Sequence, residues 1–108
     1  MRWIDLERLR IYAGESDRFG GLPLYEHLVR RAHDGGLHGA TVLRGMMGFG
    51  AGSVIHTPNI LRLSEELPVI VEIVDQADRV DAFCGANADV LDKAFVTRDT
   101  VSVWPKSR

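Results

Sequence analysis

Cysteine is the scarcest chemistry-bearing residue in this sequence, because Cys84 is the only one among 108 residues. A lone cysteine excludes an intramolecular disulfide framework and a metal site built from several cysteines. Its neighbours predict a buried, apolar thiol. No apolar run approaches the ~20 residues of a membrane-spanning helix, because Glu72 interrupts the best one. The charged start, MRWIDLERLR, predicts no signal peptide, so we expect a cytoplasmic protein without membrane insertion.

Positive charge is not in excess either. The chain has 13 Lys and Arg against 15 Asp and Glu, a formal net charge of −2 at pH 7. A general nucleic-acid binder should show a clustered basic excess, so we expect no nucleic-acid partner. The length and the hydrophobic content of 45% fit one domain over residues 1–108 with its own core.

Motifs of catalysis are also missing. The sequence has no serine-centred nucleophile elbow, and its cysteine is predicted to be buried. Glu15 and Asp17, in the segment GESD, form a carboxylate pair beside Arg18. Asp and Ser side chains in turns commonly bond to their own backbone, so turn capping is the favoured role for this segment. We expect a protein that is not an enzyme.

Hydrophobic periodicity predicts four strands, with a turn-rich connection, GESDRFGG, after the first. The strands are expected at residues 8–13, 38–44, 67–75 and 99–104. One face of the sheet should be covered by the helices. On the opposite face we expect a mixture of aromatic, aliphatic and arginine side chains, which is typical of interface cores. This face favours a closed cyclic oligomer, and its predicted members are Arg8, Arg10, Tyr12, Leu43, Ile70, Glu72, Val74, Ser102 and Trp104.

Two helices are predicted between these strands. The first begins at Pro23 and ends at Gly35–Gly36, with an apolar stripe of Leu24, Leu28 and Ala32. Asp75 or Asp78 can cap the second, whose inner side carries Val80, Phe83, Cys84, Asn87 and Leu91. Two right-handed crossovers of this kind predict an α+β, ferredoxin-like (βαββαβ) fold. Both helices cover one face of the sheet, and a long loop joins strands two and three.

That loop, from Arg44 to Leu67, concentrates glycine. Gly45, Gly48, Gly50 and Gly52 fall within eight residues. Such glycines can take positive φ and present backbone N–H groups to an anion such as phosphate. The pattern matches neither GxxxxGK[ST] nor GxGxxG, and a bulged strand end that needs flexibility explains it equally well.

The order of motifs resembles the PII nitrogen-regulatory signalling proteins: GLHGATVLRGMMGFG, then HT, then LPVIVEIVDQADRVDAF. The resemblance is closer still to a bacterial and archaeal PII-like family of unknown function. It shares RIYAGESD, PLYE, GATVLRG, GFG and LRLSEELPV, and extends from Leu9 to Val103. It implies a ferredoxin-like homotrimer that binds an adenine nucleotide between subunits, against the GFG turn. By the same resemblance, the long loop would then regulate a membrane transporter, a channel or an enzyme.

Carried over position by position, the resemblance makes Thr41, Gly48, Phe49 and Gly50 the floor of the ligand site, with His56 and Thr57 further out in the loop. The PII glutamine after GFG is replaced by Ala51–Gly52, and the PII phosphate loop shrinks to VLDKAFVTRD. We therefore expect a ligand smaller or less charged than ATP, and no resident cofactor. Four residues are candidate anion partners: Arg44, Arg62, Lys93 and Arg98.

Two alternatives remain open. A metal-binding trimer, similar to the divalent-cation-tolerance proteins, would use histidines, although no two are spaced i, i+4; the candidates are His27, His33, His38 and His56. A trimeric adaptor would bind one partner constitutively through the same loop. The sequence assigns no metal site.

Overall fold

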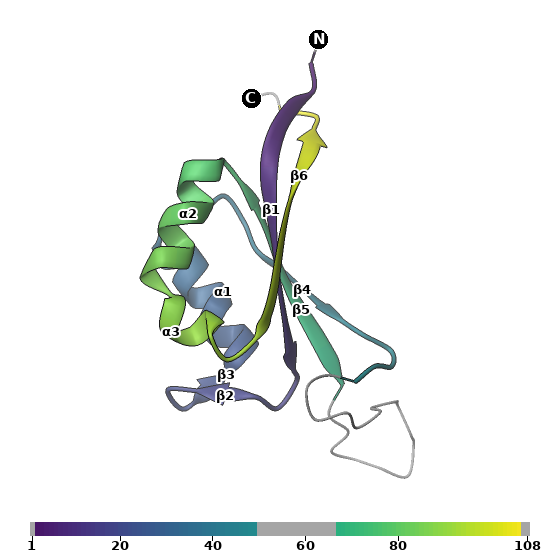
Figure 1. The fold of residues 1–108 in the computed structure, drawn as a ribbon, viewed down its shortest axis with the longest axis vertical. Coiled ribbons are helices and arrows are strands. Elements are labelled where there is room, and N and C mark those ends of the chain that lie inside the picture. The colour runs from purple at the N-terminus through teal and green to yellow at the C-terminus, as the bar shows by residue number, and fades with distance from the viewer. Residues whose placement is uncertain (1, 50–66, 107–108) are drawn as a thin grey trace.

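The computed structural model describes residues 2–49 and 67–106. Four strands form one antiparallel sheet in the order β4-β5-β1-β6, with the helices on one of its faces (Figure 1). This confirms the predicted α+β architecture with a four-stranded sheet. In chain order the elements are β1 (Ile4–Gly14), β2 (Arg18–Phe19), β3 (Leu22–Pro23), α1 (Leu24–Asp34), β4 (Thr41–Arg44), β5 (Pro68–Asp75), α2 (Ala77–Ala86), α3 (Ala88–Leu91) and β6 (Phe95–Val103).

The core lies between the sheet and the helices, where the predicted periodicities place it. Strand β5 alternates between buried and partly exposed residues over its whole length, as a strand with one covered face must. The predicted stripe of α1 and the predicted inner side of α2 pack on that face. The largest fully buried apolar side chains in the described residues are Leu9, Ile11, Leu24, Leu28, Val71, Ile73, Val80 and Val90.

Helix α1 ends as predicted and begins one residue after Pro23, whereas the start of α2 is not capped as predicted. Helix α1 follows Pro23 and stops at Gly35, after which Gly36 has a φ of +77°. Neither Asp75 nor Asp78 caps α2, since Gln76 occupies the N-cap position without a side-chain bond. The carboxylate of Asp75, fully buried at the end of β5, instead accepts the backbone N–H groups of His38 (3.0 Å) and Gln76 (2.8 Å). Asp75 therefore joins the segment after α1 to the end of β5.

The connection after β1 contains a small hairpin that the sequence analysis missed. Strands β2 and β3 pair Phe19 with Leu22 across Gly20 and Gly21, whose φ angles are +58° and +82°. A two-residue hairpin turn with positive φ at both positions is where a Gly-Gly pair is favoured. The dipeptide was the available signal for this turn.

The predicted facing of β6 was wrong by one residue. Ser102 pairs with Asp5, which lies on the helix side of β1, whereas Val101 pairs with Leu6 and Val103 with Ile4 on the open side. Ser102 therefore does not belong to the open face, and Trp104 lies beyond the end of β6. Both alternating sets of residues in TVSVW contain apolar side chains, so the pattern could not decide which set faces the core. Pairing with β1 decides it.

Candidate functional site

At the root of the long loop, the chain after β4 lies in close contact with the start of β5. The backbone N–H of Gly45 donates to the carbonyl oxygen of Pro68 at 2.7 Å. A Cβ at Gly45 would lie 2.7 Å from Pro68 Cγ, closer than real Cβ atoms approach. Neither Gly45 nor Gly48 has a positive φ, so the expectation that these loop glycines take positive φ was wrong for both of them. Gly45 is required by close approach of the two strands, while Gly50 and Gly52 lie outside the described residues.

Glu15 contacts both sides of this root. Its backbone N–H donates to Leu67 O at 2.8 Å, just before β5. Its carboxylate accepts Arg44 Nε at 3.1 Å and Arg44 Nη2 at 2.8 Å, at the end of β4. Asp17 accepts the Gly14 N–H at 2.8 Å, so the predicted turn capping is confirmed for Asp17. Sequence analysis missed the Glu15–Arg44 pair because the two residues are 29 positions apart in the chain.

Four of the predicted ligand residues lie along the β4 edge of the sheet or just after it. Thr41 lies on the open face opposite Glu72, and Arg44 ends the strand. Gly48 and the exposed Phe49 follow at the loop root. Gly50, His56 and Arg62 lie outside the described residues.

The other two predicted ligand residues lie at the β6 side. Lys93 is exposed just before β6. Arg98, within β6, already donates from all three of its nitrogens: Nε to Glu7 (3.0 Å), Nη1 to Asp81 (2.6 Å) and Nη2 to the Ala77 carbonyl (3.2 Å). The hydrogen bond to Asp81, more than that to Glu7, holds the pKa of Arg98 above its ordinary value. Its contacts fasten α2 to the sheet, so Arg98 reaches a ligand only by giving some of them up.

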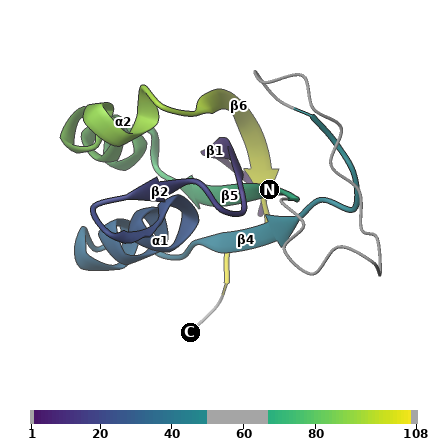
Figure 2. The same ribbon diagram turned by 90° about the horizontal axis from the view of Figure 1, so that it is seen from below.

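The two groups are on opposite edges of the sheet. Strands β5 and β1 separate β4 from β6 (Figure 2). Three strand spacings amount to about 14 Å. One copy of the chain therefore does not bring Lys93 next to Thr41 and Phe49.

The open face of the sheet is arranged in rows that cross the strands. The row nearest the loop root is apolar and partly exposed, and it consists of Leu43, Ile70, Tyr12 and Phe95. The next rows carry two ion pairs, Arg10 with Glu72 (2.8 Å) and Arg8 with Asp99 (2.6 Å). The hydrogen bond from Arg8 holds the pKa of Asp99 below its ordinary value. Leu6 with Val101 and Ile4 with Val103 make the far end apolar again.

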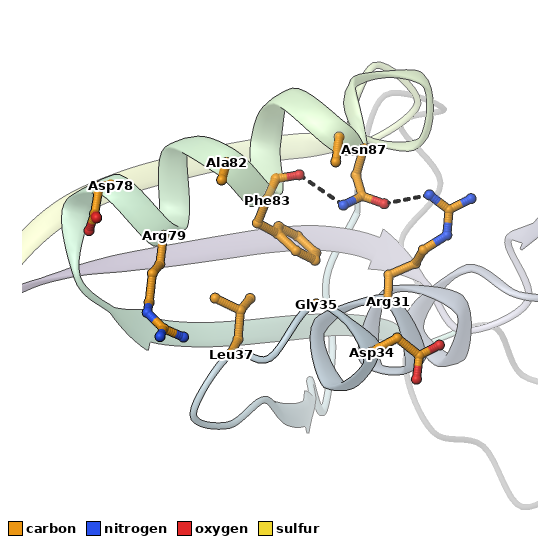
Figure 3. A pocket seen from close by; sticks show the side chains of 10 residues that line it. Arg31, Asp34, Gly35, Leu37, Asp78, Arg79, Ala82, Phe83 and Asn87 are labelled. Atoms are coloured by element: carbon orange, nitrogen blue, oxygen red, sulfur yellow. Dashed lines mark hydrogen bonds between the residues drawn. The ribbon is translucent and has the colours of Figure 1, made fainter.

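A separate groove of about 680 Å³ runs between α1 and α2 (Figure 3). Arg31 Nη1 donates to Asn87 Oδ1 at 2.8 Å, and the Asn87 amide nitrogen donates to the Phe83 carbonyl at 2.8 Å. Arg79 Nη1 donates to the Gly36 carbonyl at 2.8 Å. These bonds join the two helices, and no predicted ligand residue lines the groove.

The histidine candidates are spread over the fold. His27 packs on Phe19 with 4.8 Å between ring centroids. His33 lies beside Asp34 at 3.4 Å and His38 near Asp75 at 3.7 Å, while His56 is outside the described residues. Within residues 2–49 and 67–106, no three His, Cys, Asp or Glu side chains come together to hold a metal ion.

Cys84 is partly rather than fully buried, contrary to the prediction. It lies on α2 at the margin of the core, and burial raises the pKa of its thiol. The thiol is therefore a weak nucleophile at neutral pH. None of the helices in the described part of the chain is long and apolar enough to cross a membrane.

Comparison with known proteins places the chain in a family. The model of the DUF190 family, described as "Uncharacterized ACR, COG1993", matches residues 6–103. The chain belongs to the DUF190 family. A UPF0166 protein of Aquifex aeolicus is 39% identical over 83 residues, which are 77% of this chain and 79% of that protein. A UPF0166 protein of Methanocaldococcus jannaschii is 40% identical over 73 residues, 68% of this chain and 67% of that protein.

Solved structures show that this DUF190 chain has a PII-like fold. CPII from Thiomonas intermedia K12, bound to ADP and bicarbonate, aligns with a TM-score of 0.70 at 11% identity, covering 95% of this chain and 92% of CPII. A PII-like signalling protein of Thermus thermophilus aligns with a TM-score of 0.62 at 17% identity, covering 97% of this chain and 93% of that protein. The resemblance stated from the motifs is thereby confirmed, and these alignments establish the fold alone.

Proposed function

We propose that this DUF190 chain is a PII-like regulatory protein. It forms a homotrimer, binds an adenine nucleotide of few phosphates between its subunits, and regulates a transporter or an enzyme through the loop between β4 and β5. The observation that carries the proposal is the division of the candidate ligand residues between opposite edges of one sheet. A site that uses both groups needs the β4 edge of one subunit and the β6 edge of the next.

The open face supports such an assembly. A contact between the β4 edge of one copy and the β6 edge of another is heterologous, and it closes only as a ring. The ion pairs of the open face are satisfied within one chain. Its outer rows expose apolar side chains, including Phe95 (69% exposed) and Leu43 (44% exposed), that a neighbour would cover.

The cations at the two edges support the choice of ligand. Arg44 and Lys93 are exposed, and together they would offer two positive charges to a ligand once Arg44 leaves the Glu15 carboxylate. A triphosphate would leave more negative charge unpaired than ADP or AMP would. CPII, which shares the fold, binds ADP, AMP and bicarbonate. Binding of ligand would then be coupled to the loop, and such couplings are typically about 1–3 kcal/mol.

Subunit mixing tests the shared site. Titration calorimetry should show ADP or AMP binding to the assembled wild-type protein. Arg44→Gln, at the β4 edge, and Lys93→Gln, at the β6 edge, should each weaken it about tenfold or more, because each removes a charge-assisted bond. Sedimentation velocity on the same samples establishes whether each variant still assembles.

The decisive sample is the two variants refolded together at equal amounts. In a ring, a cleft made of an intact β4 edge and an intact β6 edge arises in about one quarter of positions, so about one quarter of the sites should recover wild-type affinity. If the mixture recovers none, the ligand site lies within one chain. A monomeric wild-type protein that binds no nucleotide would remove the proposal altogether.

A further inference from the structure

The segment GESD, predicted only to cap a turn, places one carboxylate on the candidate ligand arginine. We propose that Glu15 is a positioning residue that occupies the anion position of Arg44, and that an anionic ligand binds by replacing its carboxylate. The ligand group is a phosphate of the nucleotide or a bicarbonate ion. Both present two oxygens that can accept a bidentate pair of hydrogen bonds from a guanidinium. This inference rests on the proposed function.

The geometry of the pair is that of anion recognition by arginine. Arg44 Nη2 lies 2.8 Å from both Glu15 oxygens, and Nε lies 3.1 Å from Oε2. The planar guanidinium fork meets a carboxylate and a phosphate in the same way, through parallel N–H bonds. Arg44 is 59% exposed and Glu15 30% exposed, so a dissolved anion can reach the pair.

The backbone around Glu15 fixes where its carboxylate stands. Asp17 bonds to Gly14 through both its carboxylate (2.8 Å) and its own N–H (3.1 Å), and the Asp17 carbonyl accepts the Leu24 N–H at 2.7 Å. Glu15 itself is bonded through its N–H to Leu67 O. Because these hydrogen bonds fix the backbone of the turn, we expect the Arg44 side chain, and not Glu15, to move when a ligand binds.

When a ligand replaces Glu15 on Arg44, only one of the two contacts that Glu15 makes at the root of the loop is broken. While Glu15 holds Arg44, one residue contacts the chain at the end of β4 and, through its N–H, the chain at Leu67. When a ligand takes Arg44, the first contact is lost and the second stays. Because the Glu15 carboxylate and the ligand anion compete for the Arg44 side chain, binding of the anion would change the contacts on the β4 side of the loop root only.

Arg98 and Arg30 show what distinguishes Arg44. Arg98 is bound to acceptors on β1 and on α2, so no single anion replaces them. Arg30 pairs with Glu26 at 2.9 Å on the surface of α1, four residues apart, and neither residue is among the candidate ligand residues. Glu26 therefore supplies a matched control for removing the charge of an exposed carboxylate paired with arginine.

The experiment compares Glu15→Gln, Arg44→Gln and Glu26→Gln with wild type by titration calorimetry of the assembled protein. Probes are ADP, adenosine and bicarbonate, each titrated separately. Glutamine keeps the shape and the backbone N–H of residue 15 but releases the arginine. We expect E15Q to bind ADP about two- to fivefold tighter, the range of an exposed ion pair. E26Q should bind ADP as wild type does, and R44Q about tenfold more weakly.

Each outcome has a distinct meaning. A gain for E15Q with ADP alone identifies a nucleotide phosphate on Arg44, and a gain with bicarbonate alone identifies bicarbonate. If wild type binds ADP and bicarbonate but E15Q binds neither more tightly, the competition is refuted while the proposed function stands. An equal gain with adenosine also refutes it, because adenosine carries no anion. If none of the proteins binds any probe, it is the proposed function that fails.

Discussion

The close approach at the root of the long loop makes Gly45→Ala a quantitative test of the structure. The added Cβ would lie 2.7 Å from Cγ and 3.4 Å from the carbonyl oxygen of Pro68. A proline ring cannot rotate away as a flexible side chain can, so β4 and β5 must separate. That strains the 2.7 Å hydrogen bond between Gly45 N–H and Pro68 O.

The magnitude follows from two opposing effects. Overpacking by one methyl group destabilises a well-packed site by about 1–3 kcal/mol. Replacing glycine by alanine also reduces the freedom of the unfolded chain, which stabilises the protein by about 0.4–1 kcal/mol. We expect Gly45→Ala to lower the free energy of unfolding by about 1–2 kcal/mol.

Gly85→Ala is the matched control. No heavy atom outside the local chain lies within 4 Å of a Cβ at Gly85, inside α2. Alanine there should raise the free energy of unfolding by up to about 1 kcal/mol, the difference in helix propensity. The two substitutions therefore have opposite expected signs.

Denaturant unfolding followed by circular dichroism measures both variants, with all samples at one protein concentration because assembly shifts apparent stability. Pro68→Ala removes the Cγ atom, so Gly45→Ala should be less damaging in that background. A Gly45→Ala variant as stable as wild type would refute the packing argument. So would a cost that stays the same after Pro68→Ala.

Two further predictions concern groups whose pKa the fold changes. Because burial raises the pKa of the Cys84 thiol, Cys84 should react more slowly with a disulfide reagent at pH 8 in the folded protein than in the protein unfolded by guanidinium. Equal rates in the two states would contradict the burial of the thiol. The pKa of Asp99 is lowered by Arg8, so its contribution to stability is complete above the unfolded-state pKa and disappears as pH falls through the folded-state value. The difference in unfolding midpoint between wild type and Asp99→Asn should therefore shrink between pH 7 and pH 2, and a constant difference would count against it.

The order of elements and the core were predictable because they depend on local periodicity. The apolar spacing of Leu24, Leu28 and Ala32 identifies the inner side of α1 without knowledge of its neighbours. The alternation from Val69 to Ile73 does the same for β5. The motif GATVLRGMMGFG then placed Thr41, Gly48 and Phe49 on one strand and the segment that follows it.

The sheet face that each β6 side chain occupies, and the residues that each side chain contacts, depended on neighbours that are distant in the chain. The facing of Val101 and Ser102 could not be derived from β6, because only its pairing with β1 chooses between two similar sets of side chains. Gly45 was interpreted as a residue that can take a positive φ, and it proved to need room beside Pro68. Both depend on which strand lies alongside, which local spacing does not encode.

The sequence by itself determined the order of helices and strands along the chain and the family of this protein, since strand and helix periods and the order of motifs are properties of neighbouring residues. Only the tertiary structure decided which charges are already paired. It binds Arg98 to Glu7 and Asp81, and Arg44 to Glu15. It also put the candidate ligand residues on two edges of one sheet, because strand order, unlike strand period, is set by long-range pairing.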